Sequence, residues 1–258
     1  MNIFPRMELR MHFGLKHKVR TARRWLVMAL YNHQKWMAEI RNSQHEVLSA
    51  NPNPKYPGAY ERIEKRFWLY IPKWITELKQ SGFQAKRVLD IGCAYGTLSV
   101  FAKRLFGCEI YCTDFTDVYL SPILRDRHGF HFAINNIEND EFPWPDKFDI
   151  IVFTEVIEHL NFHPVPTLQK IRGLLAPGGK LFVSTPDASE WGRITEYYAR
   201  IEDIPWPVKS QEVVDAHIWQ YTLNELEDSV HKGGFRIDKF RYSPGSPSRH
   251  FNLQLSVN

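Results

Sequence analysis

The segment Val88-Leu89-Asp90-Ile91-Gly92-Cys93-Ala94-Tyr95-Gly96 is the most informative part of this 258-residue chain for its fold. An apolar run ends at an acidic residue, and a glycine-rich turn then opens a helix-like segment. Glycines at 92 and 96 let the backbone approach a ligand closely at the carboxyl end of a first strand. Dinucleotide-binding turns carry a third glycine and hold a diphosphate. Here Asp90 precedes only two glycines, which favours a cationic ligand; a tight turn without a ligand is the alternative.

Further short apolar runs alternate with helix-like segments along the chain. Their hydrophobicity is continuous rather than alternating, which indicates strands that are covered on both faces. The last two runs lie near the end of the chain and would add a final pair of strands to the sheet. We therefore predict an α/β fold with a doubly wound, mostly parallel seven-stranded sheet, whose strands lie at Arg87–Ile91, Glu109–Thr113, Phe130–Ile134, Phe148–Phe153, Lys180–Ser184, Phe235–Tyr242 and Phe251–Val257.

Residues 1–58 predict an N-terminal helical extension with a linker, followed by the main domain over residues 59–258. Apolar residues between Trp25 and Ile40 recur at spacings typical of a helix. A proline-rich break follows at residues 51–58, and a second helix is expected from about Tyr60 to Gln80. Residues 1–24 hold seven basic side chains and one acidic one. Packing on the main domain, contact with a membrane surface and a role as a dimer arm all remain open for this extension.

Composition and charge exclude several classes of protein. With 43% hydrophobic and 24% charged residues, the chain is globular rather than disordered. A net charge of +4 is too mild for nucleic-acid binding by the whole chain. The chain has only three cysteines, which indicates a reducing cytoplasm. It contains no apolar run of 18 residues, so the sequence predicts no membrane-spanning helix. The basic start lacks the features of a secretory signal. We expect a cytoplasmic protein, with peripheral membrane contact through residues 1–40 left open.

The stretch around residue 90 resembles the first motif of the class I S-adenosylmethionine (SAM) dependent methyltransferases, a Rossmann-like family. The resemblance covers roughly residues 85–235, because three further segments match in order and at the proper spacing: Tyr111–Asp114, Pro143–Asp149 and Leu174–Leu181. The chain departs from the family after the third strand, where Asn136 stands in place of the usual aspartate. The resemblance implies an enzyme that uses SAM.

The resemblance also implies which residues bind the cofactor. In the family the glycine-rich turn wraps the methionine portion of SAM, and an acid at the end of the second strand, here Asp114, accepts both ribose hydroxyls. Asn136 would accept a hydrogen bond from the adenine amino group, and Ile137 would pack on the ring. The full set implied for the cofactor is Asp90, Gly92, Cys93, Ala94, Tyr95, Gly96, Asp114, Phe115, Asn136, Ile137, Thr154 and Glu155.

A group of acids and histidines follows the fourth predicted strand, in the segment Thr154–Leu160. In a helix, positions 155, 158, 159 and, with one more turn, 163 share one face. Two carboxylates and two imidazoles on such a face do acid/base work or hold a divalent metal. His163 precedes Pro164 at an expected helix end, so we assign it to structure or to substrate contact.

The same segment looks like the Glu-x-x-Glu-His element of ubiquinone-pathway O-methyltransferases and of small-RNA 2′-O-methyltransferases. The segment His217–Leu226 is similar to the one that supplies their distant histidine. The resemblance implies Mg²⁺ or Mn²⁺ on Glu155, Glu158, His159 and His217, with His159, His217 and Glu155 as catalytic residues. A histidine base without metal and purely structural histidines are the alternatives.

An insertion over about residues 187–216, together with the segment after it, is rich in aromatic side chains. We expect a helical, aromatic cap over the acceptor pocket, because aromatic faces suit sugar rings and flat aglycones; an ordinary core is the alternative. Acidic residues outnumber basic ones in the insertion, which argues against RNA as the substrate. The aromatic residues are Trp191, Tyr197, Tyr198, Trp206, Trp219 and Tyr221.

Together these patterns favour O-methylation of a hydroxyl on a small or glycosidic acceptor, such as a sugar, a polysaccharide or a lipid-linked intermediate, with or without a divalent metal. A quinone precursor or another small metabolite is the alternative acceptor. Two alternatives belong to other classes: a SAM-binding module without turnover and a membrane-surface partner protein. The missing third glycine disfavours a nicotinamide-dependent oxidoreductase. The sequence does not determine the oligomeric state.

Overall fold

A seven-stranded sheet with strand order β3-β2-β1-β4-β5-β7-β6 lies at the centre of the computed structural model, which describes residues 26, 30, 31, 34–52, 55–193, 196–208, 214–245 and 248–258. The first five strands in this order run parallel, and β7 is antiparallel to both β5 and β6. The predicted doubly wound, mostly parallel sheet is confirmed. The strands are β1 (Arg87–Ile91), β2 (Glu109–Asp114), β3 (His131–Ile134), β4 (Phe148–Thr154), β5 (Leu175–Pro186), β6 (Phe235–Ser243) and β7 (His250–Val257).

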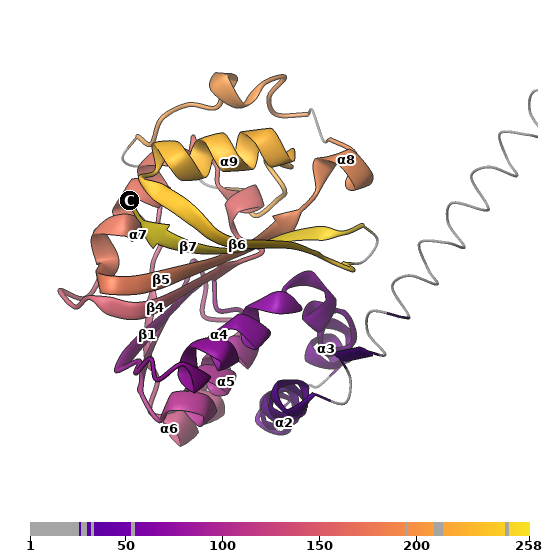
Figure 1. Cartoon of the computed structure of the whole chain (residues 1–258), viewed down its shortest axis with the longest axis vertical. Coiled ribbons are helices and arrows are strands. Elements are labelled where there is room, and N and C mark those ends of the chain that lie inside the picture. The colour runs from indigo at the N-terminus through magenta and orange to yellow at the C-terminus, as the bar shows by residue number, and fades with distance from the viewer. Residues whose placement is uncertain are drawn as a thin grey trace, which may run out of the picture.

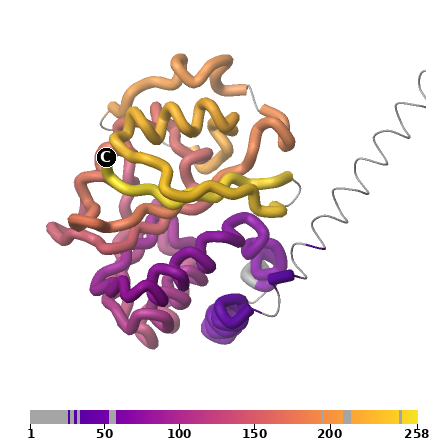
Figure 2. The backbone as a smooth tube through the Cα atoms, viewed as in Figure 1, coloured from indigo at the N-terminus to yellow at the C-terminus, as the bar shows by residue number. Residues whose placement is uncertain are grey.

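Helices cover both faces of the sheet, as Figures 1 and 2 show. Successive strand residues therefore enter different cores: Val88 packs with the first group of helices, and Leu89 packs with the second. This explains the continuous hydrophobicity of the strands. The first group is α2 (Lys35–Ser49), α3 (Lys55–Phe67), α4 (Tyr70–Gln80), α5 (Thr97–Phe106) and α6 (Pro122–His128), and the second is α7 (Pro164–Leu174), α8 (Ala188–Trp191) and α9 (Leu223–Lys232).

The single helix predicted over Tyr60–Gln80 is wrong, because two helices, α3 and α4, occupy residues 55–80. Asn252 of β7 explains the break. Its buried carboxamide donates to the carbonyl of Phe67 at 2.7 Å and accepts from the amide of Tyr70 at 3.0 Å. These two backbone groups lie at the end of one helix and the start of the next, so a side chain of the sheet satisfies them in place of helical bonds.

The N-terminal helix α2 is part of the folded core, in line with the packed alternative. Trp36, Met37 and Ile40 are buried in the cluster that α5 and the sheet share. The guanidinium of Arg104 in α5 also pairs with carboxylates of α2, at 3.0 Å to Glu39. Residues 1–25, with all the basic side chains before residue 25, lie outside the described residues. Within the described part of the chain, no helix is both long and apolar enough to cross a membrane.

Replacing Ile40 by alanine should lower the free energy of unfolding by about 2–4 kcal/mol, because its side chain is fully buried between α2 and the rest of the core. Urea unfolding followed by circular dichroism measures the loss and shows whether one transition remains. The matched control is Ile123→Ala in α6, where the side chain is 54% exposed, and a change below about 0.5 kcal/mol is expected. An Ile40→Ala effect as small as the control would mean that the packing of α2 on the main domain does not stabilise the fold.

Candidate functional site

The glycine-rich turn between β1 and α5 requires both of its glycines. Gly92 has φ +69° and Gly96 has φ +83°, a region that other residues rarely adopt. A Cβ on Gly92 would overlap Cγ2 of Val156, and one on Gly96 would lie 2.7 Å from Cδ1 of Leu120. The amide of Gly92 donates to the carbonyl of Thr113 at 2.8 Å, which ties the turn to the end of β2.

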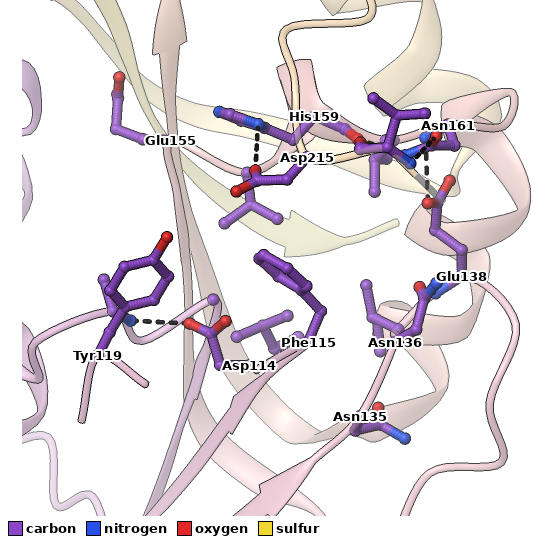
Figure 3. Close-up of a pocket in the computed structure, with 17 residues that line it drawn as sticks. Asp114, Phe115, Tyr119, Asn135, Asn136, Glu138, Glu155, His159, Asn161 and Asp215 are labelled. Carbon is purple, nitrogen blue, oxygen red and sulfur yellow. Dashed lines mark hydrogen bonds and ion pairs between the residues drawn. The ribbon is translucent and has the colours of Figure 1, made fainter. Parts of the chain in front are cut away.

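A cavity of about 280 Å³ opens beside this turn, where β1, β2 and β4 end (Figure 3). The carboxylate of Asp114 lies in it and accepts from the amide of Ala94 at 3.0 Å and from that of Thr116 at 3.4 Å. Phe115 and Ile137 line the cavity as well. The cavity therefore combines a fixed acid with apolar side chains.

The residues that the resemblance implies for the cofactor divide between this cavity and a second, smaller one of about 30 Å³. Gly92 and Ala94 line both cavities. Asp114, Phe115, Asn136, Ile137 and Glu155 line the larger cavity only, whereas Asp90, Cys93, Tyr95, Gly96 and Thr154 line the smaller one only.

Asn135 also lines the larger cavity, and the sequence analysis missed it in favour of Asn136. The carboxamide oxygen of Asn136 accepts from the amide of Glu138 at 2.9 Å and is therefore used in its own turn. The buried carboxamide oxygen of Asn135 has no hydrogen-bond partner in the described part of the chain. Asn135 and Asn136 are adjacent and identical in type, so the sequence alone could not show which of them faces the cavity.

The acids after β4 do not lie on a helix, so the predicted helical face is wrong. Glu155 has φ +56°, and only a single turn of 3₁₀ helix, η1 (Ile157–His159), follows it. Its carboxylate accepts from Ser184 Oγ at 2.7 Å and lies 2.8 Å from Nδ1 of His250. In Figure 3 it points away from the dashed pair of His159 and Asp215. Its left-handed backbone turns Glu155 out of the predicted group of four ligands.

The other three predicted ligands, Glu158, His159 and His217, do come together. One ligand atom from each lies within 4.8 Å of those of the other two. The His159 and His217 ring centroids are 4.6 Å apart, and Nδ1 of His159 is 3.4 Å from Oδ1 of Asp215. The Glu158 carbonyl accepts from the amide of Ile218 at 2.8 Å, which holds the distant histidine segment against η1.

Burial sets the charge of these three groups. It lowers the pKa of His159, and it lowers the pKa of His217 to about 4 together with the neighbouring His159 ring. It raises the pKa of Glu158 well above its usual value, and the nearby Glu155 carboxylate adds to this. At neutral pH both imidazoles are therefore uncharged and able to accept a proton or bind a cation.

His250 is a site residue that the sequence analysis missed. It is 1% exposed, contacts Glu155, and stacks on Phe67 of α3 with ring centroids 4.7 Å apart. Trp191 of α8 lies against both His250 and His217. Because His250 is the first residue of β7 and far from Glu155 in sequence, no local motif indicated it.

His163 lies elsewhere and lines neither cavity. It precedes the first residue of α7, so the expected helix end is in fact a helix start. Its ring accepts from the amide of Val165 at 3.4 Å and stacks on Trp206 with ring centroids 5.4 Å apart. These contacts support the structural role.

The cap after β5 is partly core and partly surface. Trp219 and Tyr221 are fully buried, whereas Trp206 is 60% exposed. A short 3₁₀ helix, η2 (Ile201–Asp203), lies within the cap, and residues 194, 195 and 209–213 are outside the described residues. Val214 and Asp215 line the larger cavity, so the end of the cap reaches the site.

Comparison with known proteins points in one direction. The model of a family described as "Methyltransferase domain" matches residues 60–239. The ubiquinone biosynthesis O-methyltransferase of Aeromonas salmonicida is 32% identical over 116 residues, which are 43% of this chain and 48% of that protein. The enzyme of the same name from Histophilus somni is 32% identical over 156 residues, 52% of this chain and 64% of that protein. The chain thus matches about half to two thirds of these relatives.

Solved structures share the fold. An S-adenosylmethionine-dependent methyltransferase from Clostridium acetobutylicum has a TM-score of 0.58 at 14% identity, and covers 81% of this chain and 100% of its own. The 1,6-didemethyltoxoflavin-N1-methyltransferase of Burkholderia thailandensis, solved with S-adenosylhomocysteine, has a TM-score of 0.52 at 13% identity, and covers 96% of this chain and 90% of its own. At these identities the likeness concerns the fold alone.

Proposed function

Because the chain belongs to the methyltransferase-domain family and is a class I SAM-dependent methyltransferase, we propose that it methylates a hydroxyl oxygen of a small acceptor bound beside His159. The observation that carries the proposal is the neutral His159–His217 pair. Its ring centroids are 4.6 Å apart, and His159 lines the same cavity as Asp114.

The lining of the larger cavity suits the cofactor. SAM, when bound, supplies an electrophilic methyl group on a positively charged sulfonium. No lysine or arginine of the described residues lines the cavity, whereas Asp114, Glu138, Glu155 and Asp215 do, so its charge favours a cation. We assign Asp114 to the ribose, and Ile137 with either Asn135 or Asn136 to the adenine. The unpartnered carboxamide oxygen of Asn135 supports its inclusion.

His159 is suited to accept the proton of the acceptor. SAM bound in the larger cavity would supply the methyl group to the hydroxyl oxygen, and the neutral imidazole of His159 would take up the hydroxyl proton. The carboxylate of Asp215, 3.4 Å from Nδ1, would stabilise the imidazolium that forms. His217 packs edge-on against this ring and helps to hold its orientation. We assign Glu155 to positioning, since Ser184 and His250 occupy its carboxylate.

The acceptor is most simply a phenolic hydroxyl. The relatives named above are ubiquinone biosynthesis O-methyltransferases by name, which favours the quinone-precursor alternative over a glycosidic acceptor. A phenol has a pKa near that of tyrosine, about 10, and loses its proton far more readily than a sugar hydroxyl. The acidic lining also disfavours nucleic acid, whose phosphates need basic contacts.

A metal-assisted reaction is the second candidate, and the Glu158–His159–His217 cluster favours it. Mg²⁺ or Mn²⁺ held there would stabilise the acceptor oxygen as it loses its proton. The predicted fourth ligand, Glu155, is held by Ser184 and His250 instead. We therefore favour the histidine base without metal.

The test is release of S-adenosylhomocysteine from SAM with catechol or methyl glucoside as acceptor, with EDTA or with added Mg²⁺. We expect turnover with catechol, little with methyl glucoside, and no loss in EDTA. Loss of turnover in EDTA that Mg²⁺ restores would establish the metal-assisted alternative. Turnover with methyl glucoside alone would move the acceptor back to glycosides.

A further inference from the structure

Asn161, in the loop between η1 and α7, lines the larger cavity, and its side chain binds only backbone groups. Its Nδ2 donates to the carbonyl of Val214 at 3.1 Å, and its Oδ1 accepts from the amide of Val214 at 2.8 Å. Nδ2 also donates to the carbonyl of His159 at 3.0 Å. One side chain therefore joins the backbone of His159 to the end of the cap.

The residue after Val214 is Asp215, whose carboxylate lies 3.4 Å from Nδ1 of His159. The side chain of Asp215 is 49% exposed, so little packing fixes it on the side of the solvent. Its place beside the imidazole therefore depends on how the backbone at Val214 is held. Asn161 supplies that support to both members of the His159–Asp215 pair.

The bonds at Val214 require a carboxamide. Among short side chains, asparagine offers a separate donor and acceptor in one plane. It therefore satisfies the amide and the carbonyl of Val214 together, as two paired residues of an antiparallel sheet do for each other. An aspartate at position 161 would keep the acceptor and lose the donor, and an alanine would lose both.

Glu138 fixes the backbone of Asn161 in turn. Its carboxylate accepts from the amide of Asn161 at 3.0 Å and from that of Phe162 at 2.8 Å, and Figure 3 shows it directly beside Asn161. Glu138 comes from the loop after β3, next to Ile137 of the cavity wall. The main chain of Asn161 is thus held by the sheet side of the cavity, and its side chain is free to hold the cap.

We propose that Asn161 is a positioning residue for methyl transfer, which holds the cap at Val214 so that Asp215 stays beside His159. The inference rests on the proposed function, since His159 is the proton acceptor there. A carboxylate beside Nδ1 favours the neutral imidazole that carries its proton on this nitrogen and leaves Nε2 free to accept. Without the bonds from Asn161, Asp215 would move away with the cap, and the imidazole would lose its partner.

The kinetic test is a double-mutant cycle of Asn161→Ala and Asp215→Ala, with kcat for catechol measured at saturating SAM. Displacement of a reacting group by about 1 Å can cost about 100-fold, so we expect each single variant to lose about 10- to 100-fold in kcat. If Asn161 acts through Asp215, the two losses overlap, and the double variant is much faster than their product predicts. Losses that multiply, or an unchanged kcat in Asn161→Ala, would overturn the proposal.

Hydrogen exchange of the Val214 amide, followed by NMR, tests the contact without any turnover. This amide donates to Asn161, so Asn161→Ala should speed its exchange by about 2- to 10-fold, the range for loss of one hydrogen bond. Asn161→Asp is the second variant, since it keeps the size of the side chain and loses the donated bonds. Its kcat should fall as that of Asn161→Ala does, and a full rate would contradict the role given to the carboxamide.

Asn51→Ala is the matched control. The carboxamide of Asn51 also donates to a backbone carbonyl, that of Val47 at 2.6 Å, but Asn51 lines neither cavity, so kcat and the exchange of Val214 should not change. Melting temperatures show whether each variant is folded. If the unmodified protein does not methylate catechol, the proposed function fails, and the kinetic role of Asn161 fails with it. Unchanged exchange of Val214 in Asn161→Ala would overturn the inference by itself, whatever the acceptor is.

Discussion

Replacing Gly92 by alanine is expected to weaken binding of S-adenosylhomocysteine by on the order of 100-fold or more and to lower the free energy of unfolding by about 2–4 kcal/mol. A Cβ at this position would overlap Cγ2 of Val156, and alanine is strained at φ +69°. Because Gly92 lines both cavities, any movement that relieves the overlap displaces the walls of the cofactor site. Calorimetric titration and urea unfolding measure the two effects.

Two further variants separate strain from overlap. Gly82 has φ +91° but open space around a Cβ, so Gly82→Ala should cost only about 1–2 kcal/mol and leave binding unchanged. Adding Val156→Ala to Gly92→Ala removes the overlapping methyl group and should restore part of the stability. Normal binding by Gly92→Ala alone would show that the turn does not position the cofactor.

Replacing His159 by glutamine is expected to lower methyl transfer to catechol by about 10²- to 10⁴-fold, the usual contribution of a general base. Glutamine can still hydrogen-bond to Asp215, but it cannot take up the proton of the acceptor. Affinity for S-adenosylhomocysteine should remain nearly unchanged, since the role assigned to His159 concerns the acceptor. Rates of S-adenosylhomocysteine formation and calorimetric titration test the two statements.

His163→Ala is the matched control, because this histidine stacks on Trp206 and lines neither cavity. Its rate should equal that of the unmodified protein. A His159→Gln variant that keeps its rate, or that loses cofactor affinity and rate together, would contradict the assignment of His159 as the base.

Local chemistry made the fold and the cofactor turn predictable. Strands covered on both faces are apolar at most positions of both faces, so the runs within Arg87–Ile91 and Phe148–Phe153 were visible without a structure. The glycine turn was also predictable from local sequence. Gly92 and Gly96 adopt left-handed backbone, and glycine is the residue that does so without strain.

The arrangement of the acids and histidines was predictable only in part. The pattern at Glu155, Glu158 and His159 indicated one helical face, but the left-handed backbone of Glu155 turns its carboxylate toward His250. The break between α3 and α4 likewise depends on Asn252, a residue of the last strand. The helical spacing of residues within one segment gives no information about distant partners such as His250 and Asn252.

Local patterns of residues were therefore sufficient to predict the α/β class, the order of the strands along the chain, the glycine turn and the residue types of the site. These depend on backbone conformation and on burial, which act residue by residue. Three contacts became visible in the folded structure alone: Glu155 pairs with His250, His159 meets His217 and Asp215, and Glu64 of α3 lines the small cavity. Such contacts join residues far apart in sequence, and they depend on how strands and helices align once both faces of the sheet are covered.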